Sequence, residues 1–123
     1  MSSFTELETA VLGTIFAETP TLAPGLRRQL TRATVTKRVD TEHGFFTDIA
    51  VPSDVPPVDA PDVLGHSTHA HVAGVEHGFG FVLFMNEGRL HLLEGYAFGP
   101  DVASLDLYNL SFEVYCSPIN CTE

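Results

Sequence analysis

The stretch GFGFVLFMNEGRLHLLEGYAFG, residues 78–99, decides the fold of this chain of 123 residues. Apolar side chains recur with a period of two on both sides of Asn86-Glu87-Gly88, which is typical of strands joined by a tight turn because glycine tolerates positive φ. We therefore expect strands at about residues 79–86 and 89–98, paired as an antiparallel hairpin. The rest of the sheet is expected to grow outward from this hairpin.

Four further segments show the same two-residue period. They predict strands at about residues 31–39, 45–51, 66–75 and 107–116. A turn at His77-Gly78 is expected to join the third of these segments to the central hairpin. In that register Val72 lies opposite Leu83, and Ala70 lies opposite Met85 on one apolar face.

The first thirty residues predict two helices. Ser3 and Glu6 have capping-box spacing ahead of apolar residues at helical intervals, which predicts a helix over residues 4–17. Pro24 suits the first turn of a second helix over residues 24–30. Helices followed by strands indicate an α+β fold: one domain, residues 1–123, with two N-terminal helices packed on a mainly antiparallel sheet of about six strands, curved or barrel-like.

Several classes of protein are disfavoured by composition. The chain has no run of eighteen apolar residues that would span a membrane. The start MSSFTELETAV does not resemble a signal peptide, so we expect a cytoplasmic protein. In that compartment Cys116 and Cys121 are expected to stay reduced. Because no nucleophile elbow or phosphate-binding loop is present, we expect no enzyme activity and no cofactor.

Charge is distributed unevenly along the chain. The formal net charge is −10. Residues 1–38 hold five basic against three acidic residues, whereas residues 39–123 hold one basic residue against thirteen acidic ones. Such a surface repels phosphate backbones and disfavours nucleic-acid binding, but it attracts a basic protein. Solvated acids that merely prevent self-association are the alternative.

A proline-rich loop concentrates part of this acidity. The segment VPSDVPPVDAPD, residues 51–62, has four prolines and is expected to form neither a helix nor a central strand. Its carboxylates, Asp54, Asp59 and Asp62, are the predicted partner-binding residues. The function expected from the sequence is a non-catalytic module that docks a basic protein, in its sharpest form an immunity-like protein that binds a basic nuclease toxin.

Histidines are concentrated in residues 66–77, which include His66 and His77. His69 and His71 share one face of a strand, and with Glu76 they match part of a cupin metal motif. A small cupin-like metal-binding protein or metalloenzyme is therefore the alternative function. The favoured interpretation is a polar strand end without metal, because only two convergent ligands can be placed.

Two features of the central hairpin remain open at this stage. Glu94 falls opposite Phe81 on the core face, so it is expected either to be a buried acid or to be turned outward by a bulge at Gly95. Phe84, Val82 and Leu93 fall on the second face of the sheet. Since two helices cover only one face, the second face is expected to be buried by sheet curvature or, preferably, in a homodimer.

Three segments resemble a family of small bacterial proteins of unknown function. They are LRRQLTRATVTKR (residues 26–38), GFFTDIAVP (residues 44–52) and residues 78–99, so the resemblance spans residues 26–99. Members of that family often carry a tryptophan-proline pair after the "LEGY" segment, whereas this chain has no tryptophan. The resemblance implies a compact cytoplasmic domain and no particular activity.

Overall fold

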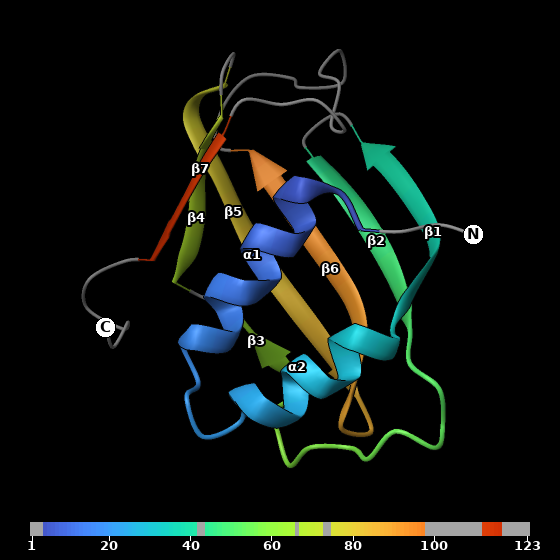
Figure 1. Cartoon of the computed structure of the whole chain (residues 1–123). Coiled ribbons are helices and arrows are strands. Elements are labelled where there is room, and N and C mark those ends of the chain that lie inside the picture. The colour runs from blue at the N-terminus through green and yellow to red at the C-terminus, as the bar shows by residue number, and fades with distance from the viewer. Residues whose placement is uncertain (1–3, 42–43, 66, 73–74, 98–111, 117–123) are drawn as a thin grey trace.

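In the described part of the chain's computed structural model, two helices pack on one face of a seven-stranded sheet (Figure 1). The structure describes residues 4–41, 44–65, 67–72, 75–97 and 112–116, and at residues 72, 75–77, 115 and 116 it describes the backbone alone. The elements are α1 (Glu6–Ala17), α2 (Ala23–Arg32), β1 (Thr34–Thr41), β2 (Gly44–Ala50), β3 (Val63–Leu64), β4 (Thr68–Val72), β5 (Val75–Asn86), β6 (Arg89–Ala97) and β7 (Phe112–Cys116). The predicted α+β class is confirmed.

Helix α1 begins two residues later than predicted. Its N-cap is Thr5, whose hydroxyl accepts from the Glu8 amide at 3.1 Å while the Glu8 carboxylate accepts from the Thr5 amide at 2.8 Å. This reciprocal pair is a complete capping box, so the helix starts at Glu6 rather than at residue 4. Ser3, the predicted cap, lies outside the described residues.

Helix α2 begins at Ala23, one residue before the predicted start. Pro24 occupies the first turn, where the missing amide hydrogen costs nothing. The helix runs to Arg32, two residues beyond the predicted end, and buries Ala23, Leu26 and Gln29. A buried glutamine in this set is unusual and proves to be an anchor for the loop described below.

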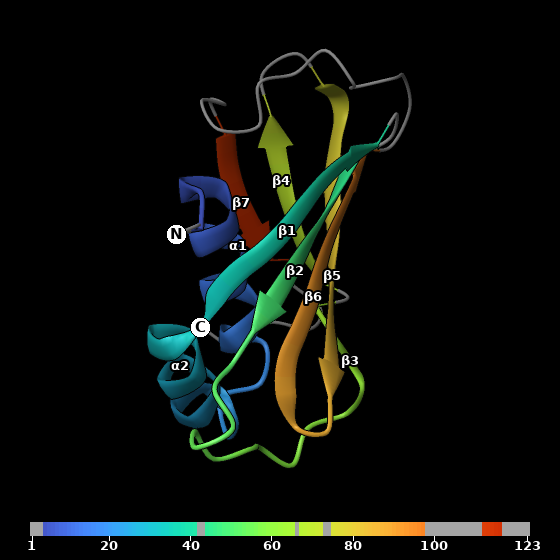
Figure 2. The same ribbon diagram turned by 90° about the vertical axis from the view of Figure 1, so that its right-hand side faces the viewer.

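The strands pair in the order β1-β2-β6-β5-β4-β7, and every pair is antiparallel. The edge strands β1 and β7 do not pair with each other, so the described sheet is open rather than a barrel. The additional strand β3 contributes two residues, Val63 and Leu64, which pair with Phe84 and Leu83 of β5. Figure 2 shows both helices on one side of the sheet.

The predicted register between β4 and β5 is wrong. Val72 pairs with Val75, and Ala70 pairs with Phe79 rather than with Met85. The chain therefore reverses between Val72 and Val75, not at residues 77–78. The physical reason is the length of β5, which has twelve residues: β4 pairs with one part of it and β3 pairs with another part.

The predicted register between β5 and β6 holds only near the turn. Leu90 lies opposite Met85 as expected, and Glu87 and Gly88 adopt φ of 52° and 78°. Beyond the turn, the pairing shifts at a bulge, because Leu92 pairs with Phe84 and leaves His91 without a partner across the ladder. One extra residue exchanges the two faces of β6.

This bulge changes two predicted positions. Leu93 was expected on the second face, but it pairs with Leu83 and is fully buried in the core. Glu94 was expected opposite Phe81, but it pairs with Val82, and Gly95 takes the position opposite Phe81. The predicted bulge at Gly95 is therefore at His91 instead, and it leaves Glu94 on the face away from the helices.

The core lies between the helices and the inner face of the sheet. Three phenylalanines from two strands, Phe45, Phe79 and Phe81, form its aromatic centre, with ring centroids 6.1–6.4 Å apart. Helix α1 covers them with Leu7, Val11, Leu12, Ile15 and Phe16, all buried. The two-residue period of the sequence predicted that Phe79 and Phe81 lie on the same face of β5.

A buried ion pair ties α1 to β1 and β2. Glu8 is 1% exposed, and its carboxylate accepts from Arg38 Nε at 2.8 Å and Nη2 at 2.7 Å. The Thr47 hydroxyl donates to it at 2.6 Å. Burial raises the pKa of Glu8, but the hydrogen bonds from Arg38, Thr47 and Thr5 outweigh burial, so this pKa lies below its ordinary value.

Sequence reasoning missed this buried acid, although two signals point to it. Glu8 follows Thr5 at capping-box spacing, and it stands three and seven residues before Val11 and Ile15 on the apolar face of the helix.

As to membrane association, none of the helices in the described residues is long and apolar enough to cross a bilayer.

Candidate docking surface

The face of the sheet opposite the helices, which we term the outer face, is largely apolar. Among the side chains that the structure describes, cross-strand pairing places seven apolar or aromatic ones on it: Val39, Phe46, Val63, Val82, Phe84, Leu92 and Tyr96. Val39 is 40% exposed and the other six are half-buried. No helix or strand among the described residues covers this face (Figure 2). Apolar surface of this kind is typical of protein interaction sites.

Tyr96 and Gly80 fit together on the outer face. A Cβ atom added to Gly80 would lie 2.6 Å from the Tyr96 ring, so the ring lies directly against the backbone of β5. This close approach explains why residue 80, the second glycine of GFGF (residues 78–81), is a glycine. The segment lies in strand β5 and is not a nucleotide-binding loop.

Two carboxylates stand among the apolar residues of the outer face. Glu94 lies between its cross-strand partners Phe46 and Val82. Asp48 lies between Leu92 of β6 and Lys37 of β1. Both acids are half-buried. The outer face thus combines apolar side chains with negative charge, and Lys37 is the basic residue beside them.

The proline-rich loop that follows β2, residues 51–62, is held in place by a buried glutamine. Gln29 of α2 is fully buried, and its Nε2 donates to the carbonyl oxygens of Pro56 at 3.2 Å and Gly88 at 2.8 Å. Its Oε1 accepts from the Leu90 amide at 3.0 Å. One side chain therefore joins α2, the loop and the β5–β6 turn.

Further hydrogen bonds fix the loop along its length. Arg89 Nη2 donates to the carbonyl oxygens of Ser53 and Val55, each at 3.1 Å. The Val58 amide donates to the Gly88 carbonyl at 2.8 Å. The Val55 side chain is 3% exposed and buries the middle of the loop. The loop is therefore anchored at several points along its length.

The three predicted partner-binding carboxylates, Asp54, Asp59 and Asp62, are all exposed on this loop. Asp54 forms an ion pair with Arg32 at 3.4 Å, and both side chains are more than half exposed. An exposed pair of this kind contributes at most about 1 kcal/mol, so Asp54 remains available to a partner. Asp59 and Asp62 form no ion pair with the described residues.

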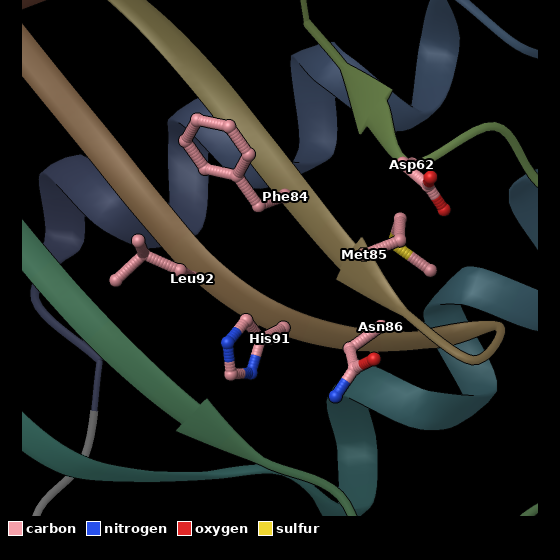
Figure 3. A pocket seen from close by; sticks show the side chains of 6 residues that line it. All are labelled: Asp62, Phe84, Met85, Asn86, His91 and Leu92. Carbon is pink, nitrogen blue, oxygen red and sulfur yellow. The ribbon is translucent and has the colours of Figure 1, made fainter.

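Asp62 also lines a hollow of about 500 Å³ at the end of the outer face (Figure 3). Its carbonyl oxygen accepts from the Met85 amide at 2.8 Å, which fixes the aspartate beside β5. Phe84 and Leu92 form the apolar part of the hollow, and Asn86 and His91 stand nearer the β5–β6 turn. The bulge of β6 places His91 and Leu92 there.

The candidate metal ligands are not assembled in the described part of the chain. His69 is half-buried, with Nδ1 3.1 Å from the Ser67 carbonyl oxygen, and His71 is exposed opposite Glu113. No group of three or more ligating side chains in the described residues is placed to hold a metal ion. His66 lies outside these residues, as do the side chains of Glu76 and His77.

The predictions for the cysteines fall at the end of the chain. Cys116 ends β7, where the backbone alone is described, and Cys121 lies outside the described residues.

The sequence did not predict that Gln29 and Arg89 anchor the proline-rich loop. Gln29 stands three residues after Leu26 on the buried side of α2, a signal that it is a core residue.

Comparison with protein-family models, with curated proteins and with solved structures finds no match to this chain.

Proposed function

We propose that this chain is a non-catalytic protein-binding module that docks a basic partner protein. The observation that carries the proposal is the anchored loop, which exposes Asp54, Asp59 and Asp62, with Asp62 at the end of the outer face and Asp54 beside Arg32 of α2. A segment already fixed before binding loses little conformational entropy when it binds, so its contacts contribute more of their free energy to affinity.

Charge sets the chemistry of the partner. The chain carries a formal net charge of −10, and among the described residues of the outer face Asp48 and Glu94 outnumber the basic Lys37. Negative potential over the docking surface accelerates association with a basic protein and disfavours acidic competitors. An immunity-like protein that binds a basic nuclease is the sharpest form of this proposal.

The outer face supplies the apolar contact that charge alone does not. Protein interfaces combine an apolar centre with a polar rim, and aromatic side chains contribute most to their affinity. Among the described side chains of the outer face, the aromatic ones are Phe46, Phe84 and Tyr96. The partner is therefore expected to bring apolar residues together with arginine or lysine.

A second copy of the chain is the alternative occupant of the outer face. A two-fold homodimer places the same patch on both partners, so the acidic patch faces itself. Asp48 and Glu94 would then need compensation from Lys37 of the other copy. Charge complementarity therefore favours a basic partner over a homodimer, and sedimentation of the isolated chain distinguishes the two.

The test is capture of the partner from lysate of the native cell at low and high salt. Wild type is compared with a loop variant, Asp54→Asn Asp59→Asn Asp62→Asn, and with a control variant, Glu6→Lys Asp40→Asn. The control changes the net charge by the same amount at exposed sites outside both the loop and the outer face. We expect a partner of high isoelectric point that is released by salt, retained by the control and lost by the loop variant. Equal capture by both variants, or recovery of no basic protein, contradicts the proposal.

A further inference from the structure

The hollow beside Asp62 has the composition of a site for a single basic side chain. It is lined by Asp62, Phe84, Met85, Asn86, His91 and Leu92. Asp62 is the acidic residue among them and lies next to Met85, while the aromatic ring of Phe84 lies farther from it over β5 (Figure 3). We propose that this hollow is the anchor site for an arginine side chain of the basic partner. This inference rests on the proposed function and adds the identity of the recognised group.

The polar side chains at the hollow are available to a ligand. Asp62, Asn86 and His91 are exposed, and within the described residues their side chains form no hydrogen bond. The carboxylate of Asp62 and the amide oxygen of Asn86 are acceptors, which suit a donor-rich cation. An anion is disfavoured because it would meet the Asp62 carboxylate.

The apolar part of the hollow selects arginine over lysine. A guanidinium group is planar and weakly hydrated, so it stacks on an aromatic ring while its N–H groups pair with a carboxylate. Phe84 and Leu92 are half-buried and adjacent across the β5–β6 ladder. They provide a surface for the guanidinium plane and for the methylene groups of the side chain.

Three separate features of the fold position this site. The Met85 amide holds the Asp62 backbone at 2.8 Å, the pairing of Val63 with Phe84 holds β3 beside β5, and the bulge at His91 places Leu92 opposite Phe84. Because each contact is made by backbone atoms, Asp62→Asn and Phe84→Leu change the chemistry of the hollow and leave these hydrogen bonds in place.

Nuclear magnetic resonance titration of the ¹⁵N-labelled chain with acetyl-arginine amide tests the inference. The matched controls are Nα-acetyl-citrulline amide, whose side chain has nearly the same shape but no charge, and Nα-acetyl-lysine amide, whose side chain keeps its charge. We expect shifts of the Phe84, Asn86, His91 and Leu92 amides with a dissociation constant on the order of 10 mM or tighter. Arginine should bind more tightly than lysine, and citrulline should not bind measurably.

Two variants and one control variant locate the binding. Asp62→Asn should weaken arginine binding roughly tenfold or more, since a charge-assisted hydrogen bond is lost. Asp59→Asn removes a neighbouring loop charge outside the hollow and should leave the affinity unchanged. Phe84→Leu should abolish the preference for arginine over lysine. Shifts that are absent, equal for citrulline, or insensitive to Asp62→Asn overturn the inference.

The outcome separates this inference from the proposed function. If the loop variant loses the partner but the hollow ignores arginine, docking stands and the anchor is wrong. If the hollow binds arginine but no basic partner is captured, the site stands as an arginine site and the docking proposal is wrong.

Discussion

Replacing Glu8 by glutamine tests the buried ion pair that fastens helix α1 to the sheet. Glu8 is 1% exposed, and the Arg38 side chain is 10% exposed. Glutamine removes the negative charge and turns an amide hydrogen donor toward groups that also donate. Removing one partner of a buried ion pair lowers the free energy of unfolding by about 3–5 kcal/mol, because the other charge is left uncompensated.

The magnitude is large relative to the stability of a small domain, which is typically about 5–15 kcal/mol. Urea unfolding followed by circular dichroism measures it. At the usual urea slope of about 1–3 kcal/mol per M, the denaturation midpoint should fall by roughly 1–5 M. Glu6→Gln is the control, since Glu6 is exposed in the same first turn and its charge contributes less than about 1 kcal/mol.

A second variant separates the ion pair from general disruption. Arg38→Met alone leaves the Glu8 carboxylate without its cation, whereas Glu8→Gln with Arg38→Met removes both charges and keeps a side-chain oxygen that accepts from Thr47 or Thr5. The double variant should be more stable than Arg38→Met alone. A loss below about 1 kcal/mol for Glu8→Gln, or a double variant less stable than Arg38→Met, refutes the reasoning.

Acid should weaken the fold through the same carboxylate. Because the pKa of Glu8 is lowered in the folded chain, the stabilisation from its carboxylate is fully present above the ordinary pKa of 4.5 and is lost as pH falls through the lower folded value. Below pH 4.5, the free energy of unfolding should therefore fall more steeply for wild type than for Glu8→Gln. Parallel pH curves for the two proteins would contradict this. Gln29→Leu should cost about 1–3 kcal/mol and speed hydrogen exchange at the Leu90 amide, which loses its acceptor; unchanged protection at Leu90 counts against the anchoring role. Gly88→Ala should destabilise by at least about 1 kcal/mol, since φ is 78° and a Cβ atom would lie 2.6 Å from the Val58 carbonyl oxygen; a thermal midpoint equal to wild type would show that the loop adjusts.

Much of the fold follows from local sequence patterns. The two-residue period along residues 79–86 and the glycine of the Glu87-Gly88 turn predict the central hairpin correctly. Pro24 marks the start of α2 in the same way. These features depend on residues close together in the chain, where propensity and pattern decide the structure.

Register depended on information that is not local. The pattern of HSTHAHVAGV fits several alignments against the long apolar strand β5, so the reversal between Val72 and Val75 was not predicted. The bulge at His91 changes the face of every later residue in β6, including Leu93 and Glu94. Alternation alone does not reveal a single inserted residue.

The candidate docking surface was predicted in part. The proline and aspartate content of residues 51–62 predicts a loop with exposed carboxylates, and the structure places all three on the surface. The hollow beside Asp62 was not predicted, because it joins the loop to Phe84 of β5 and Leu92 of β6. Its existence depends on the bulge and on β3.

The most direct test of the docking proposal is the salt dependence of affinity for the captured basic partner. Isothermal titration calorimetry gives the dissociation constant for wild type, for the loop variant Asp54→Asn Asp59→Asn Asp62→Asn, and for the control variant Glu6→Lys Asp40→Asn. We predict that salt weakens wild-type and control binding steeply, while the loop variant binds weakly at low salt and responds little to more. The same affinity and the same salt dependence for wild type and the loop variant would contradict the proposal.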